Sequence, residues 1–382
     1  MNFIPFSKPE VGPEELANVT EVLKSGWLTT GPYAKQFEDD FVNFMGGDVE
    51  AIAVSSATSG LHLALEAMGV CPGDEVITTT HTFTATAEVI RYLGANPVFV
   101  DIDRETFCID PTEIEKAITP ATKVIIPVHY AGRAADMMEI LRIAQKYDVK
   151  VLEDAAHALP TRENGRLVGT LESDATVFSF YANKTMTTGE GGMVVTRDQE
   201  IAKRCRVMRL HGIDRDAFGR FTSEKPSWWY EVVAPGFKYN MPDIAAAIGV
   251  EQLKKVNGFQ KRREELAKFY NKALADLPII CPQDVPESDL HAWHLYVIQL
   301  KPECGIGRDE FIEKMYAEKV GCSVHYIPLH LQPYWRDKYQ LKPEMFPVSQ
   351  NFFEHCVSLP LYSGLSLDSA ALVVSAIKRI LS

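Results

Sequence analysis

The first half of the chain alternates between short apolar runs rich in β-branched residues and longer segments with apolar positions at helical spacing. The short runs are typical of buried strands, and the longer segments are typical of helices that cover a sheet. One such helix is expected over 135–147. This alternation predicts a mostly parallel sheet with helices on both faces. The expected strands cover 51–55, 75–79, 97–101, 124–128, 149–153, 175–180 and 192–196.

The pattern changes after Asp243, where a long helical stretch is expected from Ile244 to about Leu274. A strand is expected at 293–298 and a last helix at 367–381. We therefore expect a large domain over 1–250 and a smaller C-terminal α/β domain over 251–382. The chain has 382 residues, 46% of them hydrophobic, which is enough for two sizeable cores.

Charge and composition exclude several classes of protein. A formal net charge of −12 argues against a general nucleic-acid binder, whose surface should be basic. No apolar run of about 18 residues is present to span a membrane, and the N-terminus lacks the features of a signal peptide. Seven scattered cysteines without Cys-x-x-Cys spacing indicate reduced thiols and a cytoplasmic location. His325 and His330 stand five apart, but no metal-binding motif accompanies them, so no metal is expected.

Lys184 stands between an expected strand and a glycine-rich turn that leads to the next strand. Partial burial lowers the pKa of a lysine amine, because desolvation disfavours the ammonium form. A neutral amine at such a strand end is a nucleophile that forms a Schiff base with an aldehyde cofactor. An ordinary loop lysine is the alternative, and this segment alone leaves both open.

Asp154 ends the strand expected at 149–153. Ligands of open α/β sheets bind at the carboxyl ends of parallel strands. An aspartate there suits the ring nitrogen of pyridoxal phosphate, since an anion keeps that nitrogen protonated and the ring electron-withdrawing. The alternative is that Asp154 caps a helix that begins after it.

A hydroxyl-rich loop at 56–60 separates the strand at 51–55 from a helix expected from Leu61. Backbone N–H groups and the positive end of a helix dipole make such a loop suitable for a phosphate. Ser179, five residues before Lys184, adds a hydroxyl for the same phosphate. Serine and threonine also cap helices that bind nothing, so the loop is weak evidence by itself.

In this order the three elements resemble the DegT/DnrJ/EryC1/StrS family of nucleotide-sugar aminotransferases, a branch of the fold-type I enzymes that use pyridoxal phosphate. The resemblance covers nearly the whole chain and implies a large domain with a seven-stranded, mostly parallel sheet between helices, plus a smaller C-terminal α/β domain. The matching segments are 25–32, 72–77, 82–86, 153–156, 179–192, 236–243, 325–330 and 359–362.

The resemblance assigns catalysis to Lys184, which would carry the Schiff base, and to Asp154, which would hold the ring nitrogen. Phe83 would stack on the ring, although a core aromatic is the alternative for it. The expected phosphate contacts are Thr58, Ser59 and Ser179, and the expected substrate contacts are Thr30, His325 and Tyr326.

Two positions depart from the common pattern of the family. His157 replaces a frequent glutamine and is expected near the cofactor ring or its 3-hydroxyl. Lys238 and Asn240 replace a frequent Asn and Arg in a loop that, in the family, reaches the neighbouring subunit's site. Because Lys238 still supplies a positive charge, the resemblance implies cofactor contacts from this loop and a homodimer with shared active sites.

The implied reaction moves an amino group from an amino acid to a nucleotide-linked keto-sugar. The expected amino donor is L-glutamate. Pyridoxamine phosphate carries the amine between the two half-reactions, and 2-oxoglutarate is released. His157 and the segments 210–214 and 238–240 favour a 4-keto-sugar, and the product would serve a surface polysaccharide, lipopolysaccharide or glycosylated natural product. Lys184 argues against a sugar dehydratase, which has histidine at that place. The complete set of Asp154, Ser179 and Lys184 argues against a regulatory or binding protein that kept only the fold.

Overall fold

Seven strands form the central sheet of the computed structural model, which describes residues 3–214 and 229–381. Six of the seven lie within one residue of their expected bounds, and β4 ends three residues earlier than expected. The strands are β1 (Glu50–Val54), β2 (Glu75–Thr79), β3 (Asn96–Val100), β4 (Thr122–Ile125), β5 (Lys150–Asp154), β8 (Ala175–Ser179) and β9 (Gly192–Thr196).

The strand order is β1-β9-β8-β5-β4-β2-β3. Neighbouring strands from β8 to β3 are parallel, and only β9 runs antiparallel to both of its neighbours. The expectation of a seven-stranded, mostly parallel sheet is therefore confirmed. The carboxyl ends of the parallel strands lie along one edge, where side chains that follow them come together.

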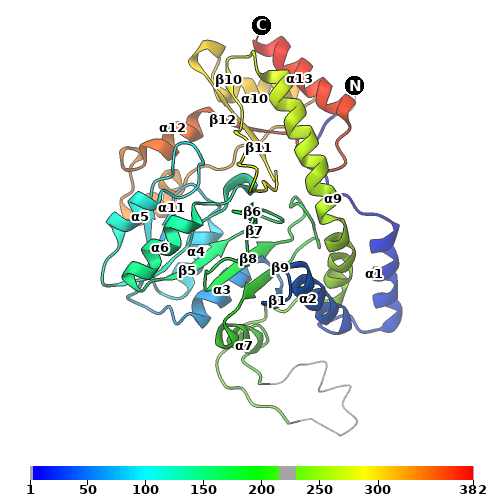
Figure 1. Cartoon of the computed structure of the whole chain (residues 1–382), viewed down its shortest axis with the longest axis vertical. Helices are drawn as coiled ribbons and strands as arrows, with labels where there is room; N and C mark the ends of the chain where they lie inside the picture. Colours follow the sequence, from blue (N-terminus) through cyan, green and yellow to red (C-terminus); the bar gives the residue numbers. More distant parts are fainter. Residues whose placement is uncertain (1–2, 215–228, 382) are drawn as a thin grey trace.

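Helices cover both faces of this sheet, because both faces are apolar (Figure 1). In β1, Ile52 and Val54 join one core, whereas Ala51 and Ala53 join the core on the opposite face. The helices of this part are α1 (Pro13–Ser25), α2 (Pro32–Phe44), α3 (Ala57–Ala67), α4 (Ala85–Tyr92), α5 (Pro111–Ala117), α6 (Met137–Tyr147) and α7 (Gln199–Met208), with a short hairpin of β6 (Arg162–Glu163) and β7 (Arg166–Leu167).

The helix α9 (Asp243–Leu274) connects the central sheet to a second, three-stranded sheet (Figure 1). Its bounds agree closely with the expected 244–274. The division expected at residue 250 therefore falls inside one continuous helix, and the separation into two domains stays a prediction. The remaining elements are β10 (Ile279–Ile280), β11 (Tyr296–Leu300), β12 (Cys356–Leu359), α10 (Arg308–Ala317), α11 (Pro333–Tyr339), α12 (Pro347–His355) and α13 (Leu367–Leu381).

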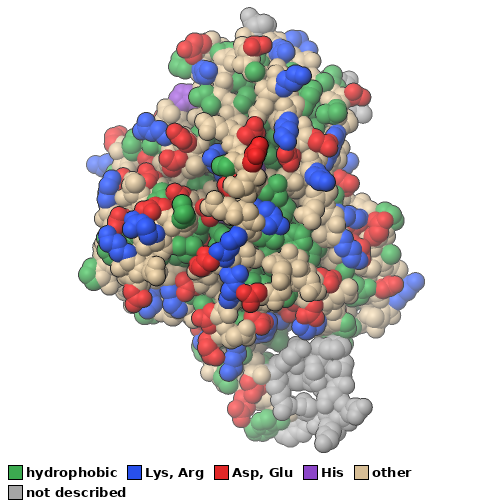
Figure 2. Space-filling view, viewed as in Figure 1, with side chains coloured by type: hydrophobic (Ala, Val, Ile, Leu, Met, Phe, Trp, Pro, Cys, Tyr) green, Lys and Arg blue, Asp and Glu red, His purple; other side chains and the backbone are tan. Residues whose placement is uncertain are grey.

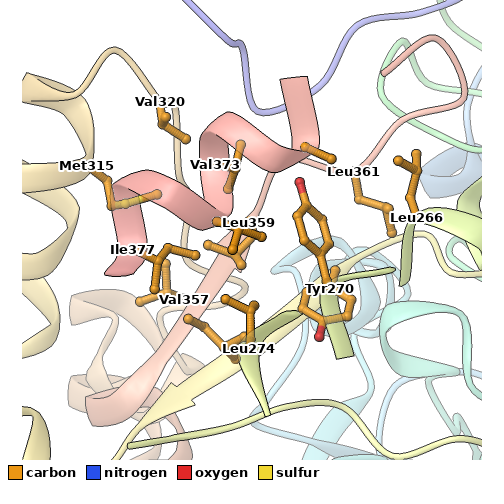
Figure 3. Packing of buried hydrophobic residues seen from close by; sticks show 14 of the residues in the cluster. Leu266, Tyr270, Leu274, Met315, Val320, Val357, Leu359, Leu361, Val373 and Ile377 are labelled. Atoms are coloured by element: carbon orange, nitrogen blue, oxygen red, sulfur yellow. The ribbon is translucent and has the colours of Figure 1, made fainter. Parts of the chain in front are cut away.

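The C-terminal part has a hydrophobic core of its own. Figure 3 shows Tyr270 and Leu274 from α9, Val357 from β12 and Ile377 from α13 pointing toward one another. Ile4 from the N-terminal segment joins the same core. This core holds the C-terminal elements together, including the segment after α10 that reaches the site described below.

Three element boundaries differ from expectation for local reasons. Helix α3 begins at Ala57 rather than Leu61, because the Ser56 side chain accepts from the N–H of Ser59 and caps the helix. Strand β4 ends at Ile125, and Val128 only forms an isolated bridge with Asp154. Strand β11 begins at Tyr296, because Trp293 has a φ of 50°, which an extended strand does not permit.

On the face shown in Figure 2, acidic and basic side chains are interspersed rather than gathered into one patch. Among the residues that the structure describes, none of the helices combines the length and apolar character of a membrane span. Within the aromatic run 228–230, Trp228 lies outside the described residues, whereas Trp229 and Tyr230 are exposed.

Candidate active site

A cavity of about 530 Å³ lies at the carboxyl ends of β5 and β8 and at the N-terminus of α3. Residues between positions 56 and 191 form most of its wall, and His325 and Tyr326 contribute to it from the C-terminal part of the chain. Its lining residues include Ser56, Ala57, Thr58, Thr82, Phe83, Thr86, Val128, Asp154, His157, Ser179, Tyr181, Asn183, Lys184 and Glu190.

Lys184 lines this cavity five residues after the end of β8, and Asp154 lines the same cavity from the end of β5. Burial lowers the pKa of the Lys184 amine to about 8, and the negative charge of Asp154 opposes part of that shift. An amine with this pKa is about one-tenth neutral at pH 7, whereas a lysine in water is almost entirely protonated. The position and the lowered pKa fit an amine nucleophile better than an ordinary loop lysine.

The lowered pKa gives a direct prediction for the cofactor-free protein. Below about pH 8 the Lys184 amine is protonated and unreactive, and above that pH it is neutral and acylates readily. Competitive labelling with acetic anhydride, read by mass spectrometry, should therefore give a midpoint near pH 8 for Lys184. The exposed Lys123 in β4 serves as the internal reference for the labelling. A midpoint for Lys184 near the ordinary lysine value, about 10.4, would contradict the account of burial.

Asp154 is buried, with 6% of its surface exposed. Its Oδ2 accepts a hydrogen bond from the Thr86 hydroxyl at 2.8 Å, and its Oδ1 accepts one from the N–H of Ala156 at 3.2 Å. Burial raises the pKa of the Asp154 carboxyl, and these two donors together with Lys184 oppose the rise. Residues 155–161 form turns rather than a helix, so the alternative of a helix cap is wrong for Asp154.

The N-terminus of α3 supplies the expected phosphate-binding corner. Thr58 and Ser179 line the cavity, but the Ser59 hydroxyl folds back and donates to the Ser56 carbonyl at 2.7 Å. The first N–H groups of a helix have no intrahelical acceptor, which leaves those of Ala57 and Thr58 for an anion. Gly192 permits this arrangement, because a Cβ there would lie 2.7 Å from the Ala57 nitrogen.

Phe83 has 59% of its surface exposed and lines the cavity. A core aromatic would be buried, so that alternative is wrong. The ring also lies 6.0 Å from the Tyr326 ring, centroid to centroid. An exposed aromatic face in a cavity of this kind is suited to cover a flat heterocycle.

His157 is buried, and its two ring nitrogens have different partners. The N–H of Ala131 donates to Nδ1 at 3.3 Å, so the ring hydrogen lies on Nε2, which donates to the Tyr326 hydroxyl at 2.8 Å. Burial, reinforced by Lys184 and His325, lowers the pKa of His157 well below its usual value, so the ring is neutral. Tyr326 therefore keeps its own hydroxyl hydrogen for a group in the cavity.

His325 lines the cavity, and its Nδ1 is paired with the Ser358 hydroxyl at 2.8 Å. Burial and Lys184 lower its pKa to about 4, so it is neutral at physiological pH. His330 instead pairs both ring nitrogens within the protein, with Thr80 and Gln350. In the described parts of the chain, no group of three or more metal-binding side chains is found.

Four expected site residues do not line the cavity: Ser59, described above, and Thr30, Lys238 and Asn240. The Thr30 hydroxyl accepts from Asn240 at 2.6 Å and donates to the Met241 carbonyl at 2.7 Å. Lys238 is exposed, and the buried Asn240 Oδ1 has no hydrogen-bond partner. The chain thus does not bring Thr30, Lys238 or Asn240 to its own Lys184, and their binding roles stay predictions.

Several residues that line the cavity were not expected there from the sequence. The most consequential is Thr86, which contacts Asp154 and stands in a segment that was noted only as family-like. The others include Ser56, Thr82, Val128, Tyr181, Asn183 and Glu190.

The residues present fit pyridoxal phosphate. A partly neutral lysine amine, a buried carboxylate, an exposed aromatic ring and the N-terminus of α3 line one cavity. The Asn183 Oδ1 is buried in this lining without a partner in the protein, as expected of a site that completes its hydrogen bonds with a bound group.

A family model described as the DegT/DnrJ/EryC1/StrS aminotransferase family matches residues 9–378. The Bacillus subtilis spore coat polysaccharide biosynthesis protein SpsC is 46% identical over 381 residues, which cover 99% of this chain and 97% of SpsC.

Two solved structures are similar over almost the full length. A candidate sugar aminotransferase of Streptococcus pneumoniae, Spr1654, is 32% identical in its apo form, with a TM-score of 0.91 and coverage of 99% of this chain and 97% of that one. The same protein is known in pyridoxamine phosphate and pyridoxal phosphate forms. Helicobacter pylori PseC, an aminotransferase of pseudoaminic acid biosynthesis, is 29% identical, with a TM-score of 0.91 and coverage of 100% and 99%.

Proposed function

The chain belongs to the DegT/DnrJ/EryC1/StrS aminotransferase family, the pyridoxal-phosphate-dependent sugar aminotransferases, and from this premise we propose its donor and acceptor. The amino donor is L-glutamate, and the acceptor is a nucleotide-linked 4-keto-sugar. The observation that carries the proposal is the meeting of Lys184, Asp154 and the N-terminus of α3 in one cavity.

Lys184 performs the proton transfers. Its Nζ takes the proton from the carbon that bears the amino group of the donor and returns a proton on the other side of the exchange. A pKa of about 8 suits this role, since the amine exists in both protonation states near neutral pH. When bound, pyridoxal phosphate supplies a ring that accepts electron density from that carbon.

The other residues hold and orient the cofactor and the sugar. Asp154 places a negative charge at the ring nitrogen, Phe83 covers one face of the ring, and Thr58 with the first N–H groups of α3 holds the phosphate. Tyr326, oriented by the neutral His157, offers its hydroxyl hydrogen to an oxygen of the cofactor or sugar. These contacts are the proposed roles of the residues.

The nature of the acceptor is supported by His157 and by the relatives. PseC is described as an aminotransferase of pseudoaminic acid biosynthesis, and SpsC as a protein of spore coat polysaccharide biosynthesis. We place this chain in the synthesis of an amino sugar for a surface polysaccharide or lipopolysaccharide. Its seven free cysteines support a cytoplasmic location.

Turnover of a panel of UDP-, GDP- and dTDP-linked 4-keto-sugars with L-glutamate tests the acceptor. We expect at least one of them to give 2-oxoglutarate and an amino sugar in equal amounts. Turnover of 3-keto-sugars alone would contradict the assignment of the 4-position, while the aminotransferase assignment itself would stand.

We also propose a homodimer in which the loop 237–240 serves the partner's cavity. Lys238 is exposed and Asn240 keeps an unpartnered buried oxygen, and neither lines the cavity of its own chain. Val232 and Val233, close to this loop, expose 62% and 56% of their surfaces. Exposed apolar side chains are typical of a surface that another subunit covers.

Mixed dimers test the shared site. A Lys184→Ala subunit lacks the nucleophile, and a subunit with Lys238→Ala and Asn240→Ala lacks the loop contacts. Mixing the two should restore activity, because a mixed dimer has one site with both features intact and one site with neither. About half of the dimers are mixed after random exchange, so we expect about a quarter of the wild-type sites to be restored.

Each inactive variant mixed with itself is the control. Tandem affinity tags on the two subunits, followed by purification through both, isolate mixed dimers. If such dimers form and remain inactive, each site is built within one subunit and the proposal is wrong.

A further inference from the structure

Two threonine hydroxyls form a hydrogen-bonded chain that ends on Asp154. The Thr86 Oγ1 lies 2.8 Å from the Asp154 Oδ2, and the Thr82 Oγ1 lies 2.8 Å from the Thr86 Oγ1. Thr86 stands in the first turn of α4, and Thr82 precedes that helix. Both threonines are buried, with 1% and 2% of their surfaces exposed, and both line the cofactor cavity.

The direction of the chain follows from the chemistry of its members. An ionised carboxylate only accepts hydrogen bonds, so Thr86 donates its single hydroxyl hydrogen to Asp154. That hydrogen is then used, and the contact between the threonines requires Thr82 to donate to Thr86. Both hydrogens thus point toward the carboxylate, and successive bonds in such a chain polarise one another.

The second oxygen of Asp154 is held less tightly. Its Oδ1 accepts the N–H of Ala156 at 3.2 Å, which is long for a bond to a charged acceptor. The shorter bond from Thr86 therefore sets the rotation of the carboxyl group. Because Asp154 is 68 positions away from Thr86 in the chain, this bond also ties α4 to the end of β5.

We propose that Thr86, supported by Thr82, is a positioning residue that keeps Asp154 ionised and turned toward the pyridine nitrogen of the cofactor. This inference rests on the proposed role of Asp154. Burial favours the protonated carboxyl, and a protonated Asp154 no longer holds a proton on the ring nitrogen. The Thr86 hydroxyl favours the ionised form because it donates to the charge.

The other groups that act on this carboxylate are known. The positive charges of Lys184 and His129 lower the pKa of Asp154, and the negative charge of Asp154 helps to raise the pKa of Tyr326. All three stay in place when Thr86 is changed. An effect of the Thr86 substitution on ionisation is thereby separable from theirs.

The test compares Thr86→Val, which keeps the shape and loses the hydroxyl, with Thr86→Ser, which keeps the hydroxyl and loses the methyl group. Cofactor-free protein is titrated with pyridoxal phosphate alone, and the absorbance of the bound cofactor is followed from pH 5 to 10. For Thr86→Val we expect a dissociation constant raised about ten- to a hundredfold, the range for a lost hydrogen bond to a charged group. We also expect the ring nitrogen to lose its proton at lower pH.

Thr86→Ser should bind and titrate close to the wild type, and Thr82→Val should show a smaller change in the same direction as Thr86→Val. Equal defects in Thr86→Ser and Thr86→Val would show that the methyl group matters and would overturn the proposal, as would wild-type behaviour of Thr86→Val. Should Thr86→Val fail to fold, Thr82→Val decides in the same way.

Asp154→Asn separates this inference from the proposed role of Asp154. If Asp154→Asn changes binding and titration and Thr86→Val does not, only the inference about Thr86 fails. If Asp154→Asn has no effect either, the role of Asp154 fails with it. Thr86→Val added to Asp154→Asn should cause no further change in titration, because the charge it acts on is gone.

Discussion

Lys184→Ala should fold and bind pyridoxal phosphate but lose transamination. The amine that this substitution removes is the proposed nucleophile and the proposed proton carrier, with a pKa of about 8. General acid–base catalysis alone contributes about 10²–10⁴-fold, so we expect the rate to fall by at least that factor. The α3 N-terminus and Asp154 remain, and the cofactor is still held through its phosphate and ring. Single-turnover absorbance measurements with L-glutamate check the rate.

Lys123→Ala is the matched control for this substitution. Lys123 is an exposed lysine in β4, near the strand end opposite the cavity, and its removal should leave the rate unchanged. Lys184→Arg keeps a positive charge without a usable nucleophile and should be as inactive as Lys184→Ala. Turnover of Lys184→Ala near the wild-type rate would end the assignment.

Asp154→Asn should also fold, because the amide oxygen still accepts the hydrogen bond from Thr86. The neutral amide no longer favours a proton on the ring nitrogen, so electron withdrawal by the ring weakens. We expect the half-reaction with glutamate to slow by about 100-fold or more, the size seen when a preorganised electrostatic partner is lost. Stopped-flow absorbance with L-glutamate measures this rate.

Asp174→Asn is the corresponding control, since Asp174 accepts a backbone N–H from Val151 just before β8 begins, away from the cavity. Its half-reaction should keep the wild-type rate. A rate for Asp154→Asn that matches this control would mean that another group serves the ring nitrogen.

The sheet and the long helix α9 could be predicted because their signals are local. Alternating faces of apolar residues specify β1, and the helical period runs unbroken from Asp243 to Leu274. The ends of helices and strands were harder to predict from the sequence, because they depend on single contacts. The cap of Ser56 on the N–H of Ser59 starts α3 four residues earlier than the apolar pattern suggests.

In the candidate site, too, the residues with local sequence signals could be predicted, whereas contacts between distant residues could not. Asp154 ends β5 and Lys184 follows β8, and these two strands are neighbours in the sheet, so the strand order alone brings the two residues together. Thr86 and Asp154 are 68 positions apart in the sequence, so no local sequence pattern predicts their contact. The choice between the hydroxyls of Thr58 and Ser59 also depends on backbone geometry, because Ser59 folds back on Ser56.

The central claim is that this chain transfers an amino group through pyridoxal phosphate held at Lys184. Its most direct test is the absorbance spectrum of the purified protein loaded with the cofactor, recorded before and after addition of L-glutamate. The account predicts a long-wavelength band that glutamate removes, with one equivalent of 2-oxoglutarate released per site, and no glutamate-dependent change in Lys184→Ala. A band that persists in excess glutamate and in other amino donors, with no keto acid formed, would contradict it.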